Sequence, residues 1–138
     1  MCSRDWVENI QTADEMRAVL QVHINTLVEQ FRGRLYAWDV VNEVFNDDGS
    51  YRQSVFFRTL GAEYIRIAFR AANAADPVAR LYLNDYHIHH PGPKLDAIIR
   101  LVQELRAEGV PIHGIGIQTH LVVADGKTPS MAKVDFPP

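Results

Sequence analysis

The chain has 138 residues, of which 47% are hydrophobic, and a formal net charge of −3. This size and composition fit one globular domain with a sizeable core, and the mild negative charge offers no basic surface for nucleic acid or for an anionic membrane. The single cysteine, Cys2, excludes an internal disulfide and a cysteine-based zinc site, and no apolar run approaches the roughly 18 residues of a transmembrane helix.

The first predicted element is a helix over residues 12–33. Thr12 followed by Glu15 forms a capping box, in which each side chain satisfies a free backbone N–H of the other residue, and Gly33 is typical of a helix end. The residues expected to form its buried stripe are Val19, Leu20, His23, Leu27 and Phe31. A continuous apolar run over residues 35–42 then predicts a strand covered on both faces, as in a parallel sheet.

Further helices and strands alternate along the rest of the chain. Gly61 is expected to break the next helix, and Pro77 to end it, because proline disfavours helical backbone in the residue before it. The expected elements are a helix at 54–75, a strand at 80–85, a helix at 93–109 and a strand at 112–118. This order predicts an α/β fold with a parallel sheet, and a doubly wound sheet and part of a (β/α) barrel both fit.

Each predicted strand ends in polar residues, and the ends of parallel strands meet at one edge of a sheet. Amides and imidazoles beside carboxylates supply the directional donors and acceptors that sugar hydroxyls need, and a tyrosine can contact a sugar ring. Polar strand ends that simply face water are the structural alternative. The three ends are Asn42-Glu43, Asn84-Asp85-Tyr86 and Gln118-Thr119-His120.

Glu43 follows the most apolar of these strands, and nothing nearby in the sequence is expected to neutralise it. In barrels of alternating strands and helices the chemistry takes place where strands end and loops begin. Glu43 is therefore a candidate general acid/base. Desolvation at the end of an apolar strand is expected to raise the pKa of Glu43 toward the range of a working acid.

Four histidines invite a metal-site interpretation, because alternate residues of a strand share one face. They are His87, His89, His90 and His120. A surface loop next to Pro91 is the favoured interpretation, so neither a metal site nor a cofactor is predicted. No glycine-rich phosphate loop follows a strand, and no nucleophile motif surrounds a serine or the cysteine.

Three motifs, taken together, point to a known family. They are Trp38-Asp39-Val40-Val41-Asn42-Glu43, Leu83-Asn84-Asp85-Tyr86 and Gly114-Ile115-Gly116-Ile117-Gln118-Thr119-His120-Leu121. With Trp6-Val7, Tyr64-Ile65-Arg66-Ile67-Ala68-Phe69 and Asp76-Pro77, they resemble endo-1,4-β-xylanases of glycoside hydrolase family 10 over about residues 5 to 121.

The resemblance implies part of a (β/α)8 TIM barrel, about strands four to six with flanking helices. Residues 1–121 are then a partial catalytic domain, and residues 122–138 are expected to be a loop or a frayed tail. The implied partner is xylan or a xylo-oligosaccharide, with no nucleic acid and no membrane. The implied location is extracellular, although the N-terminus lacks the apolar stretch of a secretory signal, so the chain as written would stay in the cytosol.

The resemblance also implies roles for six residues in a retaining mechanism. Glu43, at the end of the fourth barrel strand, would be the general acid/base, with Asn42 beside it binding the donor sugar. Asn84 and Tyr86 match residues near the cleavage point and the acceptor sugar. Gln118 and His120 match the sixth-strand motif, whose histidine holds the nucleophile and the donor sugar.

The nucleophile of the family, a glutamate in an Ile-Thr-Glu-Leu-Asp-like motif on the seventh strand, has no counterpart in this sequence. After Asp85 the only glutamates are Glu104 and Glu108, on a predicted helix. A retaining mechanism needs a second carboxylate about 5 to 5.5 Å from the first, whereas an inverting one needs a base about 6.5 to 9.5 Å away. Asp85 is the one candidate for that base.

The isolated chain is therefore expected to be inactive, and a non-catalytic truncated remnant or a sugar-binding module is the alternative. Part of a barrel also leaves strand edges open, which predicts a marginal fold and self-association. Val40, Leu83 and Ile115 are expected to be among the residues that lose packing partners.

Overall fold

A parallel sheet with the strand order β1-β2-β3 organises the molecule. The computed structural model describes residues 5–120. Its strands are β1 (Ala37–Asn42), β2 (Arg80–Tyr86) and β3 (Gly114–Gln118), and its helices are α1 (Asp5–Glu8), α2 (Ala13–Gln30), α3 (Val55–Leu60), α4 (Glu63–Ala75) and α5 (Pro93–Ala107). The predicted α/β alternation with a parallel sheet is confirmed. The predicted tail at 122–138 lies outside the described residues. None of the helices within residues 5–120 is long and apolar enough to cross a membrane.

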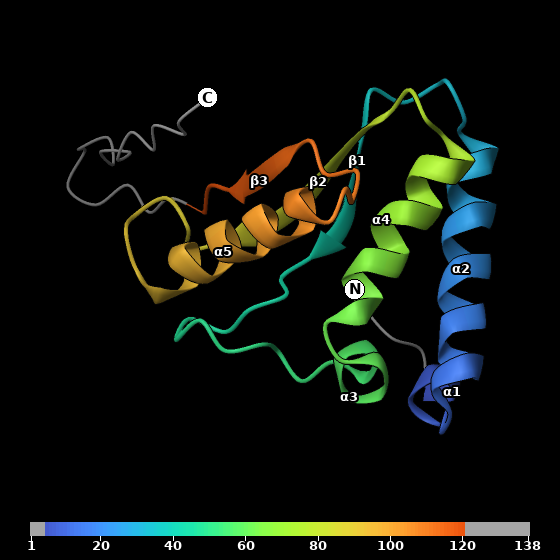
Figure 1. Cartoon of the computed structure of the whole chain (residues 1–138), viewed down its shortest axis with the longest axis horizontal. Coiled ribbons are helices and arrows are strands. Elements are labelled where there is room, and N and C mark those ends of the chain that lie inside the picture. Colours follow the sequence, from blue (N-terminus) through green and yellow to red (C-terminus); the bar gives the residue numbers. More distant parts are fainter. Residues whose placement is uncertain (1–4, 121–138) are drawn as a thin grey trace.

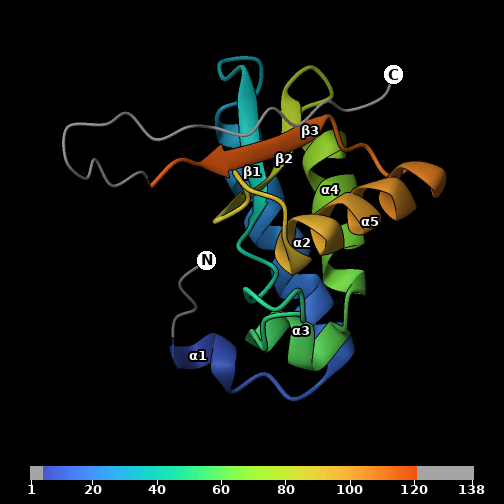
Figure 2. The same cartoon turned by 90° about the vertical axis from the view of Figure 1, so that its left-hand side faces the viewer.

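Helices α2 and α4 lie side by side (Figure 1), and both views place α1 and α3 at the same end of this pair (Figures 1 and 2). Helix α2 starts where the sequence predicts, because Oγ1 of Thr12 accepts the backbone N–H of Glu15 at 3.3 Å. Its predicted stripe is wrong at His23 and Leu27, which are exposed, whereas Leu20 is buried and Val19 is partly buried against the core. A single row packs against the core instead: Met16, Leu20, Ile24 and Val28.

Glycine and proline divide the remaining helices as predicted. Gly61 has φ 59° and separates α3 from α4, because this left-handed backbone is accessible to glycine without a steric cost. Helix α5 begins at Pro93, where the missing N–H has no helical partner to lose. Helix α5 ends at Ala107, two residues before Gly109, whose φ is 68°.

Strand β1 contains a bulge at Val40. Asp39 pairs with Tyr82 and Val41 pairs with Leu83, so Val40 is an extra residue that has no pairing partner on β2. Val40 and Val41 are both buried, whereas Asp39 is exposed. The prediction that both faces of this strand are covered along its whole length is therefore wrong. Two apolar residues follow each other in the sequence because the bulge buries both Val40 and Val41.

The two faces of β2 have different environments. Its residues alternate, with Leu81, Leu83 and Asp85 buried beneath the helices and Tyr82, Asn84 and Tyr86 half-buried on the other side. We call this second side of the sheet the open face. The expectation that Val40 and Leu83 lose packing partners is wrong, since they are 8% and 0% exposed within the helix-side core. Ile115 is half-buried against that core.

A buried carboxylate ties together the turns that lead into β1 and β2. Asp76 is fully buried, and its Oδ2 accepts the N–H of Gly33 at 2.9 Å while Oδ1 accepts that of Val78 at 3.2 Å. The hydrogen bond from Gly33 leads the influences that lower the pKa of Asp76. The ends of α2 and α4 are thereby fixed to each other before either strand begins.

Replacing Asp76 with alanine should lower the free energy of unfolding, because the backbone N–H groups of Gly33 and Val78 lose their acceptor. The lowered pKa means that ionised Asp76 stabilises the fold above its unfolded-state pKa, and this contribution is lost as the pH falls through the folded-state pKa. Urea denaturation at neutral and acidic pH should therefore show a smaller difference from wild type at acidic pH. Asp96→Ala, which removes an exposed carboxylate, is the control. If Asp76→Ala lowered the free energy of unfolding equally at both pH values, the stabilising role of ionised Asp76 would be contradicted.

We also expect the chain to self-associate through its sheet edges, because β1 and β3 each pair on one side only within residues 5–120. Light scattering after size-exclusion chromatography measures the mass. Ile117 is an exposed residue of edge strand β3, and Ile117→Lys should reduce association by placing a charge there. Val22 is exposed on α2, away from the sheet edges, and Val22→Lys should leave association unchanged. A wild-type monomer with a cooperative thermal transition would rule the expectation out.

Candidate active site

Amide side chains from three neighbouring strands meet at the carboxyl end of the sheet. Oδ1 of Asn42 accepts hydrogen bonds from Nδ2 of Asn84 and from Nε2 of Gln118, each at 2.9 Å. Nε2 of Gln118 also lies 3.3 Å from Oε1 of Glu43. We call Asn42, Asn84 and Gln118 the amide network. It holds one carboxylate oxygen of Glu43 from the side of the open face.

Backbone features of β1 and β3 make this network possible. The bulge at Val40 brings Asn42 opposite Asn84 in the strand register. On β3, Gly116 stands opposite Asn84, and a Cβ atom at Gly116 would lie 2.7 Å from Oδ1 of Asn84. The side chain of Asn84 therefore needs a glycine beside it to reach Asn42.

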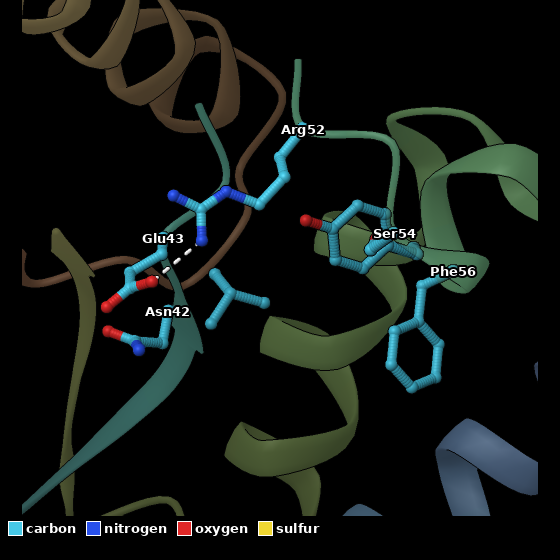
Figure 3. A pocket seen from close by; sticks show the side chains of 7 residues that line it. Asn42, Glu43, Arg52, Ser54 and Phe56 are labelled. Atoms are coloured by element: carbon cyan, nitrogen blue, oxygen red, sulfur yellow. Dashed lines mark hydrogen bonds and ion pairs between the residues drawn. The ribbon is translucent and has the colours of Figure 1, made fainter. Parts of the chain in front are cut away.

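Glu43 is the first residue after β1, and its backbone is in the left-handed region at φ 56°. Its N–H donates to the carbonyl oxygen of Asn84 at 2.8 Å, so the turn out of β1 is still tied to β2. Figure 3 shows the Glu43 and Asn42 side chains close together, with Arg52 reaching Glu43 from the loop beyond. Left-handed backbone costs a non-glycine residue about 1 to 3 kcal/mol, and such positions cluster at functional sites.

Arg52 is the principal site residue that the sequence analysis missed. Its Nη1 donates to Oε2 of Glu43 at 2.7 Å, an ion pair with both side chains about one-third exposed. The expectation that nothing neutralises Glu43 is therefore wrong. The only available signal was an arginine following the turn-rich segment 46–50, which can fold back to the end of β1.

The pKa of Glu43 is lowered, which corrects the expectation that it is raised. Desolvation is the largest single influence and does act to raise the pKa of Glu43. The hydrogen bonds from Arg52 and Gln118, with the positive charge of Arg52, together outweigh it. In this chain the carboxylate is held in its ionised form.

Tyr86 and His120 are each linked to Glu43 through one other residue, Tyr86 through Arg52 and His120 through Gln118. Nη2 of Arg52 donates to the hydroxyl of Tyr86 at 2.9 Å, and the guanidinium carbon lies 5.6 Å from the Tyr86 ring centroid. Nε2 of His120 lies 3.0 Å from Oε1 of Gln118. All the predicted site residues are thus connected by hydrogen bonds, with Arg52 completing the set.

Asp85 does not share this site. Its side chain is fully buried on the helix side of β2 and pairs with Nζ of Lys94 at 2.8 Å. Asn84 and Asp85 point to opposite faces because successive strand residues alternate. The interpretation of Asp85 as a base for an inverting reaction is therefore wrong.

The histidines of the predicted surface loop are spread along the connection after β2. His87 has φ 55° and lies 3.7 Å from Asp47, while the rings of His89 and His90 are 4.3 Å apart. Within residues 5–120, no group of three or more histidine, cysteine or acidic side chains has a geometry that could hold a metal ion.

A small cavity of about 80 Å³ lies next to Glu43, and Figure 3 shows the side chains that line it. A water molecule occupies about 30 Å³ in the liquid, and sites for larger ligands have roughly 300 Å³ or more. This cavity can therefore hold water but not a sugar ring, which would have to lie over the open face. The lining residues are Val41, Asn42, Glu43, Arg52, Ser54, Phe56 and Tyr64.

The sequence matches the model of Glycosyl hydrolase family 10 over residues 3–134. It is 49% identical over 126 residues to endo-1,4-beta-xylanase A of Phanerodontia chrysosporium, a match covering 91% of this chain and 30% of that protein. It is 47% identical over 128 residues to endo-1,4-beta-xylanase 2 of Claviceps purpurea, covering 92% of this chain and 39% of that protein.

Solved structures agree with the sequence matches. Native xylanase 10B from Thermotoga maritima gives a TM-score of 0.81 at 46% identity, covering 83% of this chain and 36% of that one. Penicillium canescens endo-1,4-beta-xylanase XylE gives 0.83 at 42% identity, covering 91% and 39%. The chain thus spans between 30% and 39% of the length of these relatives. By sequence and by fold, the chain belongs to glycosyl hydrolase family 10, and its parallel sheet with flanking helices is part of a (β/α)8 TIM barrel.

Proposed function

We propose that the chain is a segment of a retaining endo-1,4-β-xylanase in which Glu43 is the general acid/base. The observation that carries this proposal is the position of Glu43, which follows β1 at the carboxyl end of the sheet and contacts Gln118 from β3. Barrel enzymes place their catalytic groups at this end of the strands. A glutamate held there beside amide donors can protonate a leaving glycosidic oxygen.

The remaining predicted residues suit the binding of a xylo-oligosaccharide across the open face. Asn42 is proposed to bind the donor sugar, Asn84 and Tyr86 to lie near the cleavage point and the acceptor sugar, and Gln118 and His120 to contact the donor side. Two solved relatives support this ligand class. Xylanase 10B from Thermotoga petrophila RKU-1 was solved in complex with xylobiose, and an E146A mutant of TsXylA from Thermoanaerobacterium saccharolyticum was solved with xylotriose.

The chain alone is proposed to be inactive, because two requirements of the mechanism, a proton on Glu43 and a nearby nucleophilic carboxylate, are not met within residues 5–120. Its pKa is lowered by Arg52 and Gln118, so it holds no proton to donate at neutral pH. The glutamates that follow β2 in sequence lie elsewhere, since Glu104 is exposed on α5 and Glu108 pairs with Arg66. Glycosyl-enzyme formation requires a carboxylate about 5 to 5.5 Å away on the opposite side of the sugar.

A sugar-binding role without turnover is the second candidate. The amide network is complete within the described residues, and binding of sugar hydroxyls requires no nucleophile. An extracellular location, expected from the resemblance, stays a proposal as well. The relative TsXylA is named an intracellular xylanase, so membership of the family does not settle location.

The first test combines an activity assay with a binding assay. Neither wild type nor Glu43→Gln should release aryl alcohol from an aryl β-xylobioside, whereas an NMR titration with xylotriose should shift the side-chain amide signals of Asn42, Asn84 and Gln118. Release by wild type that is lost in Glu43→Gln would overturn the inactivity and imply a second carboxylate or an assembly of chains. Absence of any shift at saturating xylotriose would count against the sugar site.

The second test removes the positive charge beside Glu43. In Arg52→Met the pKa of Glu43 should rise above its wild-type value, because desolvation then acts with less opposition. A carboxyl-carbon NMR titration measures this pKa directly. Arg58→Met is the matched control, because Arg58 pairs with Glu8 and not with Glu43. An unchanged pKa of Glu43 in Arg52→Met would show that the ion pair does not set it.

A further inference from the structure

Lys94 occupies a position that ordinary stability rules disfavour. Its side chain is 3% exposed, although lysine is seldom buried. It is the second residue of α5, whose N-terminal end carries the positive end of the helix dipole and so repels a cation. Both the burial of Lys94 and its position at the N-terminal end of α5 are unfavourable for a lysine and do not stabilise the helix. They point to a role for Lys94 outside the helix.

The ammonium group of Lys94 contacts three groups from two other segments. It lies 2.8 Å from Oδ1 of Asp85, 3.4 Å from Oδ1 of Asp47 and 3.4 Å from the ring centroid of Tyr86. Oδ2 of Asp85 is buried and has no hydrogen-bond partner among the described residues. A buried ion pair satisfied this incompletely is weak evidence for stabilisation. Stability alone is therefore a poor explanation of the pair.

The contact with Tyr86 connects Lys94 to the candidate active site. The Tyr86 ring has the ammonium of Lys94 near its centroid, while its hydroxyl accepts from Arg52. Arg52 in turn pairs with Glu43 at 2.7 Å. A cation over a tyrosine ring attracts the ring electrostatically, and the attraction is stronger in a desolvated site. The ring is thus fixed by two cations, one at its centre and one at its hydroxyl.

The same lysine joins the two loops that leave β1 and β2. Asp47 belongs to the loop that also carries Arg52, and this loop packs directly on the start of α5. A Cβ atom at Gly49 would lie 2.8 Å from the carbonyl oxygen of Pro93. Loss of the Lys94 charge would therefore release the loop contact at Asp47 and the ring contact at Tyr86 together.

We propose that Lys94 is a positioning residue for the sugar site. From the start of α5 it fixes the ring of Tyr86 at the end of β2, so that the hydroxyl meets Arg52 and the exposed part of the ring is presented to an acceptor sugar. This proposal rests on the proposed function, because the sugar contact of Tyr86 is itself proposed. Lys94 touches neither Glu43 nor the amide network, and it acts through Tyr86.

The test compares Lys94→Met with Arg100→Met in the full chain. Arg100 is exposed on the same helix and provides the matched loss of charge. With ring-labelled tyrosine, Lys94→Met should shift the Tyr86 NMR signals and weaken xylotriose binding roughly threefold to tenfold. Arg100→Met should change neither, and Lys94→Arg should restore part of both. A purely structural lysine would alter only the urea midpoint, and that result would overturn the proposal.

A second measurement keeps the proposal testable if Lys94→Met does not fold. In wild type the ring current of Tyr86 should shift the Lys94 ε-methylene protons upfield, and Tyr86→Leu should abolish the shift. Unshifted ε-protons in wild type would overturn the proposal. If wild type binds no xylotriose, the proposed function fails, and the Tyr86 ring signals alone then decide whether Lys94 positions the ring.

Discussion

The bulge at Val40 is the constraint on which the candidate site depends. Side chains alternate along a strand, so one extra residue moves every later side chain to the other face of the sheet. Without the bulge, Asn42 would stand opposite Asp85 and face the helices. With it, Asn42 stands opposite Asn84 and the amide network can form on the open face. The same irregularity buries Val40 and Val41 in succession, which anchors the end of β1 just before Glu43.

Electrostatics around Glu43 set two effects against each other. Partial burial favours the protonated carboxyl, while Arg52 and Gln118 favour the carboxylate and prevail. A working acid/base needs its proton affinity raised, which a neighbouring negative charge can do. The segment described here thus holds Glu43, the proposed acid/base, with its cationic partner and its amides. For Glu43 to act as proposed, an influence that raises its pKa has to come from outside these residues, and the chain spans only part of its relatives.

Much of the fold was predictable because its signals are local. Thr12, Gly61 and Pro93 fix helix boundaries through their own backbone chemistry, and the polar ends of the strands indicated the site residues without any tertiary information. The failures were of another kind. The buried row of α2 depends on where α4 lies, and the burial of Leu83 depends on which side of the sheet carries the helices. Arg52 and Lys94 escaped notice because long side chains act across loops, where sequence distance says little about contact.

The left-handed backbone at Glu43 recurs at His87, and each residue is the first after its strand. The shared geometry belongs to the way the chain leaves the sheet, and it is indifferent to the side chain that happens to be there. The two positions should therefore differ in how they tolerate change over evolution. At position 87 glycine or asparagine relieves the backbone and costs only peripheral contacts, so drift toward those residues is favoured. At position 43 the same substitution would also remove the carboxylate that contacts Arg52 and Gln118, so relieving the backbone there has a cost that is absent at position 87.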